Sequence, residues 1–158
     1  MRYQVYEDLG HLGQDNDIFN EAGQPVLRVD GKAFSLHNFM VVKDLAGTQV
    51  AQITRNVIGA IYEISLTGGG SAEMRHHFSL LHPKWTISVS GGQLLEIIEE
   101  PGFHKFTVTQ NGQPIATVSK AWISVSDTFG VDITEGQNDL LILCCVLSLE
   151  AEMNRHSD

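Results

Sequence analysis

The chain has 158 residues, of which 42% are hydrophobic, and its net charge at neutral pH is −9. This size and composition predict one domain, residues 1–158, with enough apolar side chains for a sizeable core. Ten basic residues against nineteen acidic ones argue against a nucleic-acid partner and against simple attraction to anionic lipid. The opening, Met1-Arg2-Tyr3-Gln4, leads into no long apolar stretch, so we expect no secretory signal and a cytoplasmic location.

Short alternating segments separated by turn residues follow one another from Arg2 to Ile133. We expect strands at Arg2–Tyr6, Asp15–Asn20, Pro25–Val29, Ala33–Leu36, Phe39–Lys43, Gln49–Thr54, Ala60–Leu66, Ala72–His77, Trp85–Val89, Gln93–Ile98, His104–Thr109, Pro114–Ser119, Trp122–Ser126 and Phe129–Ile133. Regularly spaced short strands with glycine turns indicate a sandwich or a barrel. Helix propensity would also allow Leu94–Glu99 to be helical.

A weak internal repeat runs through these strands. Its clearest copies are Gly23–Val29, Gly47–Thr54 and Gly112–Ser119, and Gly69–Met74 is a looser one. Each copy turns at glycine, alternates apolar and polar residues, and reaches a basic residue before the next strand. The repeat predicts one hairpin module used several times around a common core.

The last apolar stretch, Leu140–Leu149, reads as a helix that has no polar face. Its first eight residues are all apolar, so the helix must be surrounded on every side. A membrane-spanning helix needs about 20 apolar residues, and this shorter run is typical of a buried core helix. Asn138 or Asp139 can cap its start. Polar residues return at Glu150, Glu152 and Asn154, so we expect the last turn or two to emerge into water.

The strands and the helix together predict an all-β fold with one buried helix. A barrel of about eight strands has room only for side chains, whereas a helix with its side chains is about 10–12 Å wide. Cans of about eleven strands do enclose a helix. We therefore expect a β-barrel of about twelve strands closed around the hydrophobic C-terminal helix. A barrel filled in this way would have no internal ligand cavity, which leaves the outer wall and the rims for binding.

No pattern in the sequence calls for catalysis, a metal or a cofactor, and we expect a protein that is not an enzyme. Neighbouring strand residues such as His76 and His77 point to opposite faces and cannot easily share an ion. Gly68–Ser71 lacks the ending of a phosphate loop. The candidates that remain are His82 and His104, the carboxylates Glu96, Glu99 and Glu100, and the thiols Cys144 and Cys145. The thiols are adjacent in the apolar helix, which predicts unreactive groups without an internal disulfide.

Four basic residues recur at matching places in the repeat: Lys32, Arg55, Arg75 and Lys120. They could simply cover strand ends and protect sheet edges. They could also line a site for an anion or a lipid headgroup.

The block Lys120–Ile133, which runs directly into the apolar helix, resembles the LURP-one-related family. The segments Met1–Gln4 and Val29–Lys32 look like its small bacterial members, and the likeness covers essentially the whole chain. The resemblance implies a fold similar to the tubby C-terminal domain and the phospholipid scramblases, a twelve-stranded barrel around a central C-terminal helix. Tubby domains bind phosphoinositides through a basic patch, and scramblases carry cysteine-rich acylation segments and a membrane anchor. This sequence shows neither a dense basic cluster nor the cysteine-rich segment and membrane anchor of a scramblase.

These observations lead to a functional hypothesis and an alternative. The first is a non-enzymatic binding or scaffold domain that binds a phospholipid headgroup or a protein partner on its outer wall. The alternative is lipid handling of the scramblase type, and a more remote one is an enzyme, which would require convergent carboxylates and histidines with shifted pKa values. The sequence leaves the ligand and the oligomeric state open.

Overall fold

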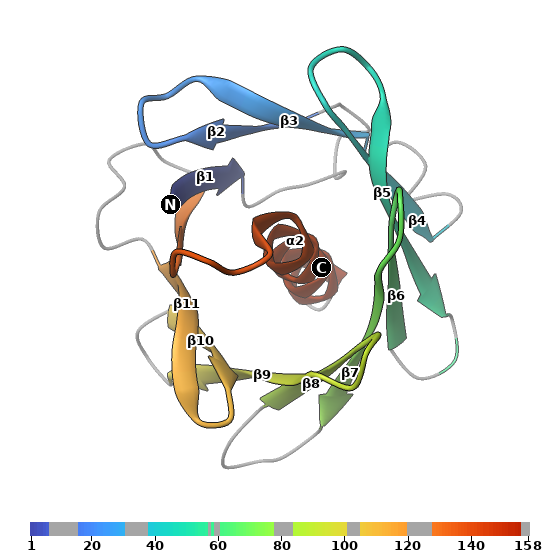
Figure 1. The fold of residues 1–158 in the computed structure, drawn as a ribbon, viewed down its shortest axis with the longest axis vertical. Helices are drawn as coiled ribbons and strands as arrows, with labels where there is room; N and C mark the ends of the chain where they lie inside the picture. The colour runs from blue at the N-terminus through green and yellow to red at the C-terminus, as the bar shows by residue number, and fades with distance from the viewer. Residues whose placement is uncertain are drawn as a thin grey trace.

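The computed structural model describes residues 1–6, 16–30, 38–56, 58, 61–77, 84–100, 105–119 and 128–155. Twelve antiparallel strands close into a barrel, and the C-terminal helix α2 (Asp139–Arg155) runs through its interior (Figure 1). The strands are β1 (Arg2–Tyr6), β2 (Asn16–Asn20), β3 (Pro25–Asp30), β4 (Phe39–Lys43), β5 (Gln49–Asn56), β6 (Ile61–Leu66), β7 (Ser71–His77), β8 (Lys84–Val89), β9 (Leu94–Glu100), β10 (Lys105–Gln110), β11 (Gln113–Ser119) and β12 (Thr128–Ile133). The predicted fold class is confirmed.

Each strand pairs with the next one in the sequence, and β1 pairs with β12 to close the barrel. The closing register places Gln4 opposite Gly130 and Arg2 opposite Asp132. Closure removes the free sheet edges that an open sheet of these strands would expose. It also gives the helix the complete enclosure that its apolar surface requires.

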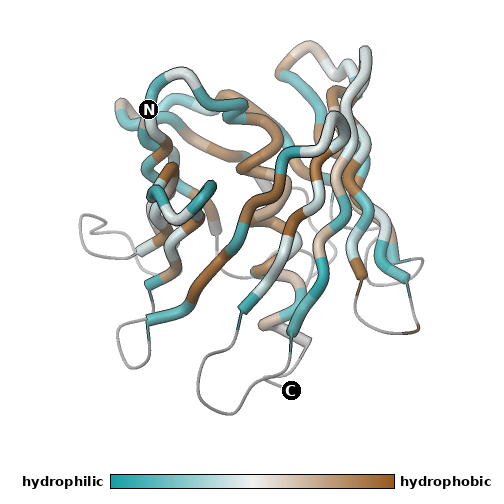
Figure 2. The backbone as a smooth tube through the Cα atoms, turned by 60° about the horizontal axis from the view of Figure 1, so that its bottom comes forward, coloured by the Kyte–Doolittle hydropathy of each residue, from teal (hydrophilic) through white to brown (hydrophobic). Residues whose placement is uncertain are grey.

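Side chains alternate between the interior and the solvent along each strand, as the pleat requires. In β7, for example, Ala72 and Met74 are buried while Ser71 and Arg75 are exposed. The inward side chains and nearly all of α2 from Leu141 to Ala151 form one apolar cluster. Figure 2 shows apolar residues recurring along the strands around the helix.

Among the described strand pairs, three contain a β-bulge shortly after a glycine-containing turn. The register skips one residue in β3, in β5 and in β11, and the extra residues are Val26, Val50 and Ile115. A bulge sets two residues of one strand against one of its partner and can re-aim a side chain. These positions coincide in the three clear copies of the sequence repeat, so the repeated module is a bulged hairpin.

The observed strands confirm the prediction wherever it can be compared. The segment Leu94–Glu100 is a strand and not a helix. The strands expected at Ala33–Leu36 and Trp122–Ser126 lie outside the described residues. At the helix start, the Asn138 side chain accepts a hydrogen bond from the Leu141 amide at 3.1 Å, which identifies Asn138 as the cap.

One expectation about the helix is wrong. Glu152 does not emerge into water but is only 3% exposed. The helix is 17 residues long and carries this carboxylate along the inside of the wall, where Arg55 and Tyr62 supply partners.

Candidate functional site

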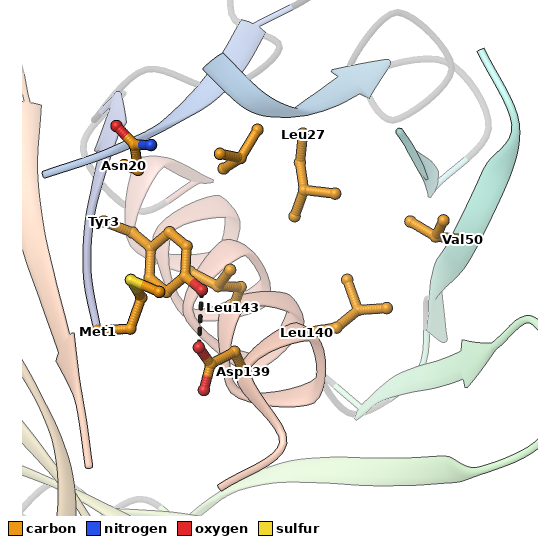
Figure 3. A pocket seen from close by; sticks show the side chains of 9 residues that line it. Met1, Tyr3, Asn20, Leu27, Val50, Asp139, Leu140 and Leu143 are labelled. Carbon is orange, nitrogen blue, oxygen red and sulfur yellow. Dashed lines mark hydrogen bonds between the residues drawn. The ribbon is translucent and has the colours of Figure 1, made fainter. Parts of the chain in front are cut away.

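The central helix lies unevenly inside the barrel. Its backbone comes closest to β5, β6 and β12. On the side of β2 and β3, a pocket of about 350 Å³ remains between the helix and the wall. Its lining residues are Met1, Tyr3, Asn20, Val26, Leu27, Val50, Asp139, Leu140 and Leu143 (Figure 3). The expectation of a barrel without an internal cavity therefore fails at this end.

Two of the bulges help to build this pocket. Val26 and Leu27 are consecutive residues of β3, yet both line it, which a regular strand would not allow. Val50, the extra residue of β5, lines it as well. Leu140 and Leu143 of α2 face these residues across the space (Figure 3). The pocket is therefore apolar on both its wall side and its helix side.

The polar part of the pocket is concentrated at the start of the helix. The Tyr3 hydroxyl donates a hydrogen bond to Oδ2 of Asp139 at 2.7 Å (Figure 3). Burial raises the pKa of Tyr3 well above its usual value, and the neighbouring Asp139 carboxylate raises it further. The first turn of a helix favours negative charge, which suits Asp139. Met1, 65% exposed, stands where the pocket meets solvent.

The structure places the four predicted basic residues differently. Arg55 is 7% exposed and points into the barrel, where its Nε lies 3.2 Å from Oε2 of Glu152. Arg75 is on the outer wall and pairs with Glu73. Arg55 and Arg75 are therefore separated by the wall and do not form one site. Lys32 and Lys120 lie outside the described residues.

Arg55 belongs to a buried polar cluster that the sequence did not reveal. The Tyr62 hydroxyl donates to the same Glu152 oxygen, and the Arg55 guanidinium lies 6.0 Å from the centre of the Tyr62 ring. Burial, and then the bond to Glu152, raise the pKa of Tyr62 far above its usual value. This cluster ties the last turns of α2 to β5 and β6. The available sequence signal was the pair of glutamates, Glu150 and Glu152, near the end of a helix that must be enclosed.

Three further cations of the described strands are paired with acids, whereas Lys43, the last residue of β4, is in no such pair within that part of the chain. The pairs are Arg28 with Asp17 at 3.2 Å, Lys84 with Glu96 at 3.3 Å and Lys105 with Glu100 at 3.8 Å. Each pair joins neighbouring strands. Among the described residues, these contacts leave the wall without a concentrated basic patch.

The histidines and cysteines that invited a chemical interpretation occupy separate places. His76 stacks on Trp85 with ring centres 4.2 Å apart, while Nε2 of His77 lies 2.8 Å from the Thr86 hydroxyl. His82 and His104 fall outside the described residues. Within the described part of the chain, no three His, Cys, Asp or Glu side chains come together as metal ligands. Burial raises the pKa of the Cys144 thiol to about 12 and that of Cys145 further still.

Of the helices in the described ranges, none has the length and apolar character needed to span a bilayer.

Comparison with known proteins identifies relatives of the whole chain. The chain is similar to the uncharacterized protein YxjI of Bacillus subtilis (strain 168), with 27% identity over 143 residues, 89% of this chain and 85% of that protein. The X-ray structure of an Arabidopsis thaliana protein superposes with a TM-score of 0.52 and 11% identity, over 97% of this chain and 91% of the other. That likeness shows the tubby C-terminal-like fold. The LURP-one-related family model matches residues 2–150, and the chain belongs to this family.

Proposed function

We propose that this protein is a cytoplasmic, non-enzymatic binding domain that holds the apolar part of a small amphiphile, such as a lipid acyl chain, in the pocket beside α2. The observation that carries the proposal is the pocket itself, about 350 Å³ in volume and open at one rim. Ligand sites in proteins have volumes of about 300–1,000 Å³ and are mostly apolar with a few placed polar groups. The Tyr3–Asp139 pair supplies such groups here.

The rigidity of the lining supports a site that exists before the ligand arrives. Leu143 is 2% exposed and held by the enclosed helix, and the bulge residues Val26 and Val50 each lie between two residues that are paired with the neighbouring strand. A preformed pocket spares the ligand the cost of ordering side chains. An apolar chain that enters it removes apolar surface from water on both partners.

Headgroup or protein binding on the outer wall is the competing proposal. Arg55 cannot serve it, because its guanidinium is inside the barrel, and Arg75 faces Glu73. Lys32 and Lys120 remain as its candidates. The pocket is the stronger proposal because its apolar walls and its polar Tyr3–Asp139 end lie together in one space.

The decisive experiment measures the binding of N-phenyl-1-naphthylamine, an uncharged fluorescent probe, and its displacement by dodecanol. Val50→Trp should fill the pocket and weaken binding about tenfold or more. Val41→Trp is the matched control, because Val41 lies on the neighbouring strand β4 and does not line the pocket. Thermal melting of both variants verifies that they fold.

Unchanged binding by a folded Val50→Trp variant, or no binding by the natural protein, would refute the pocket proposal. The outer-wall alternative is tested separately by liposome co-sedimentation with and without phosphoinositide, at low and physiological salt. Liposome binding that weakens with salt and is lost in the Lys32→Glu and Lys120→Glu variants would favour a headgroup site on the outer wall.

A further inference from the structure

We infer that the pocket selects a ligand whose polar end is an amine or another cationic hydrogen-bond donor, and that it disfavours a carboxylic acid with the same chain. This inference rests on the proposed function and adds the chemical class of the ligand. It comes from the groups that line the polar end of the pocket.

The Tyr3–Asp139 pair offers acceptors rather than donors. A tyrosine hydroxyl has one hydrogen, and that of Tyr3 is directed to Asp139. The phenol oxygen and the carboxylate therefore present lone pairs to anything that enters beside them. The Asn20 side chain is held on the turn that follows β2, because its Oδ1 accepts from the Gln24 amide at 2.9 Å and its Nδ2 donates to the Gln24 side chain at 3.1 Å.

The charges near this end are the Asp139 carboxylate and two cations, the Met1 ammonium and the Arg2 guanidinium, each of which is already bonded to β12. Asp139 is the one ionisable acid or base side chain, apart from the Tyr3 phenol, among the residues that line the pocket. The Met1 amine donates to the Ile133 carbonyl at 2.8 Å. Arg2, on the neighbouring part of β1, pairs with Asp132 at 3.2 Å and approaches Glu21 at 3.8 Å.

The barrel end around the pocket adds acids of its own. The turns at this end carry Glu21 and Glu135, which are exposed, and Asp44, which is half-buried. Their field concentrates cations near the rim, and it weakens as salt is added. The local contact with Asp139 should persist at higher salt, because a charge-assisted hydrogen bond in a partly enclosed site is screened less than the surface field.

The test compares dodecylamine, dodecanol and dodecanoate, each below its micelle concentration, by isothermal titration calorimetry at neutral pH. The amine should bind about tenfold tighter than the alcohol, and the carboxylate should bind weakest. Asp139→Asn should make the affinities for the amine and the alcohol nearly equal. Asp139→Glu should leave the order of the three affinities unchanged. Glu135→Gln, which removes a rim charge that does not line the pocket, is the control for the general field and should preserve the preference.

The outcomes separate this inference from the proposed function. If all three ligands bind with equal affinity and Val50→Trp abolishes their binding, the pocket is a ligand site but the amine preference is refuted. A tighter dodecanoate complex, or an amine preference unchanged in Asp139→Asn, would also overturn the inference. If none of the three ligands binds, the proposed function itself fails.

Discussion

The two ends of the central helix meet the barrel in different ways. At its N-terminal end, Leu140 and Leu143 face a pocket, and Tyr3 binds Asp139 near solvent. Toward its C-terminal end, Leu147 is completely buried, and Glu152 is held by Arg55 and Tyr62. The same helix is therefore closely packed around Leu147 and Glu152 and leaves usable space beside Leu140 and Leu143.

This difference suggests a division of roles along one helix. A buried charge is tolerated only where its partner is correctly placed, so the Arg55–Glu152 pair restricts the rotation and depth of α2 in the barrel. With the helix fixed at the closed end, the open end can keep an empty, apolar space without the helix shifting to fill it. The four predictions that follow test this contrast, starting with the largest effect.

A charge at the closed end should have the largest effect. We expect Leu147→Asp to prevent folding, because an unpaired buried charge costs several kcal/mol and a whole domain is stable by only about 5–15 kcal/mol. Leu143→Asp should be less harmful, because its carboxylate can reach the pocket. Soluble yield and circular dichroism melting measure both, with Leu147→Met as the volume-matched control. A soluble, cooperatively melting Leu147→Asp protein would contradict the packed end.

Removing one partner of the buried Arg55–Glu152 pair should have the second largest effect on stability. Glu152→Gln leaves the Arg55 charge buried and uncompensated and should lower the free energy of unfolding by about 3–5 kcal/mol. The control is Glu73→Gln, which breaks the exposed Arg75–Glu73 pair and should cost less than about 1 kcal/mol. Urea unfolding measures both. Equal effects would mean that the internal pair does not anchor the helix.

Truncations of matched leucines compare the packing of the two ends directly. Leu147→Ala should cost about 2–5 kcal/mol because it leaves a cavity in a filled core. Leu140→Ala should cost about 1 kcal/mol or less, since its side chain already borders open space and is partly exposed. The comparison comes from the denaturant concentrations at the unfolding midpoints, provided that the variants share the same dependence of the free energy of unfolding on denaturant. A larger loss at Leu140 would reverse the assignment of packed and open ends.

The smallest expected effect is that of the Cys145 thiol on stability at alkaline pH. The thiol of Cys145 has a pKa raised by burial, so the folded protein keeps a proton that the unfolded chain releases above its usual pKa of 9.0. Stability should therefore fall as pH rises above this value, by about 1.4 kcal/mol per pH unit for each such thiol. Melting temperatures at pH 8 and pH 10 should show a shallower decline in Cys145→Ala. If the decline is identical in this variant, the thiol does not contribute to it.

The repeat illustrates how far the sequence predicts the positions of side chains. Arg55 and Arg75 occupy similar places after a turn and a strand, yet one faces the core and the other faces solvent. β5 contains a bulge at Val50, whereas β6 and β7 pair without one. A shift of one residue reverses which face each side chain occupies. Pairs of consecutive apolar residues such as Val26-Leu27 were the sequence signal for these bulges.

The sequence by itself determined that an apolar C-terminal helix must be enclosed and that a series of short strands would have to enclose it. Burial of apolar surface follows from composition and periodicity, which are local and visible in the chain. Only the tertiary structure decided that Arg55 meets Glu152, 97 residues away, and that Tyr3 meets Asp139, 136 residues away. Such contacts depend on barrel register and on where three bulges occur, and these are set by the packing of the whole chain.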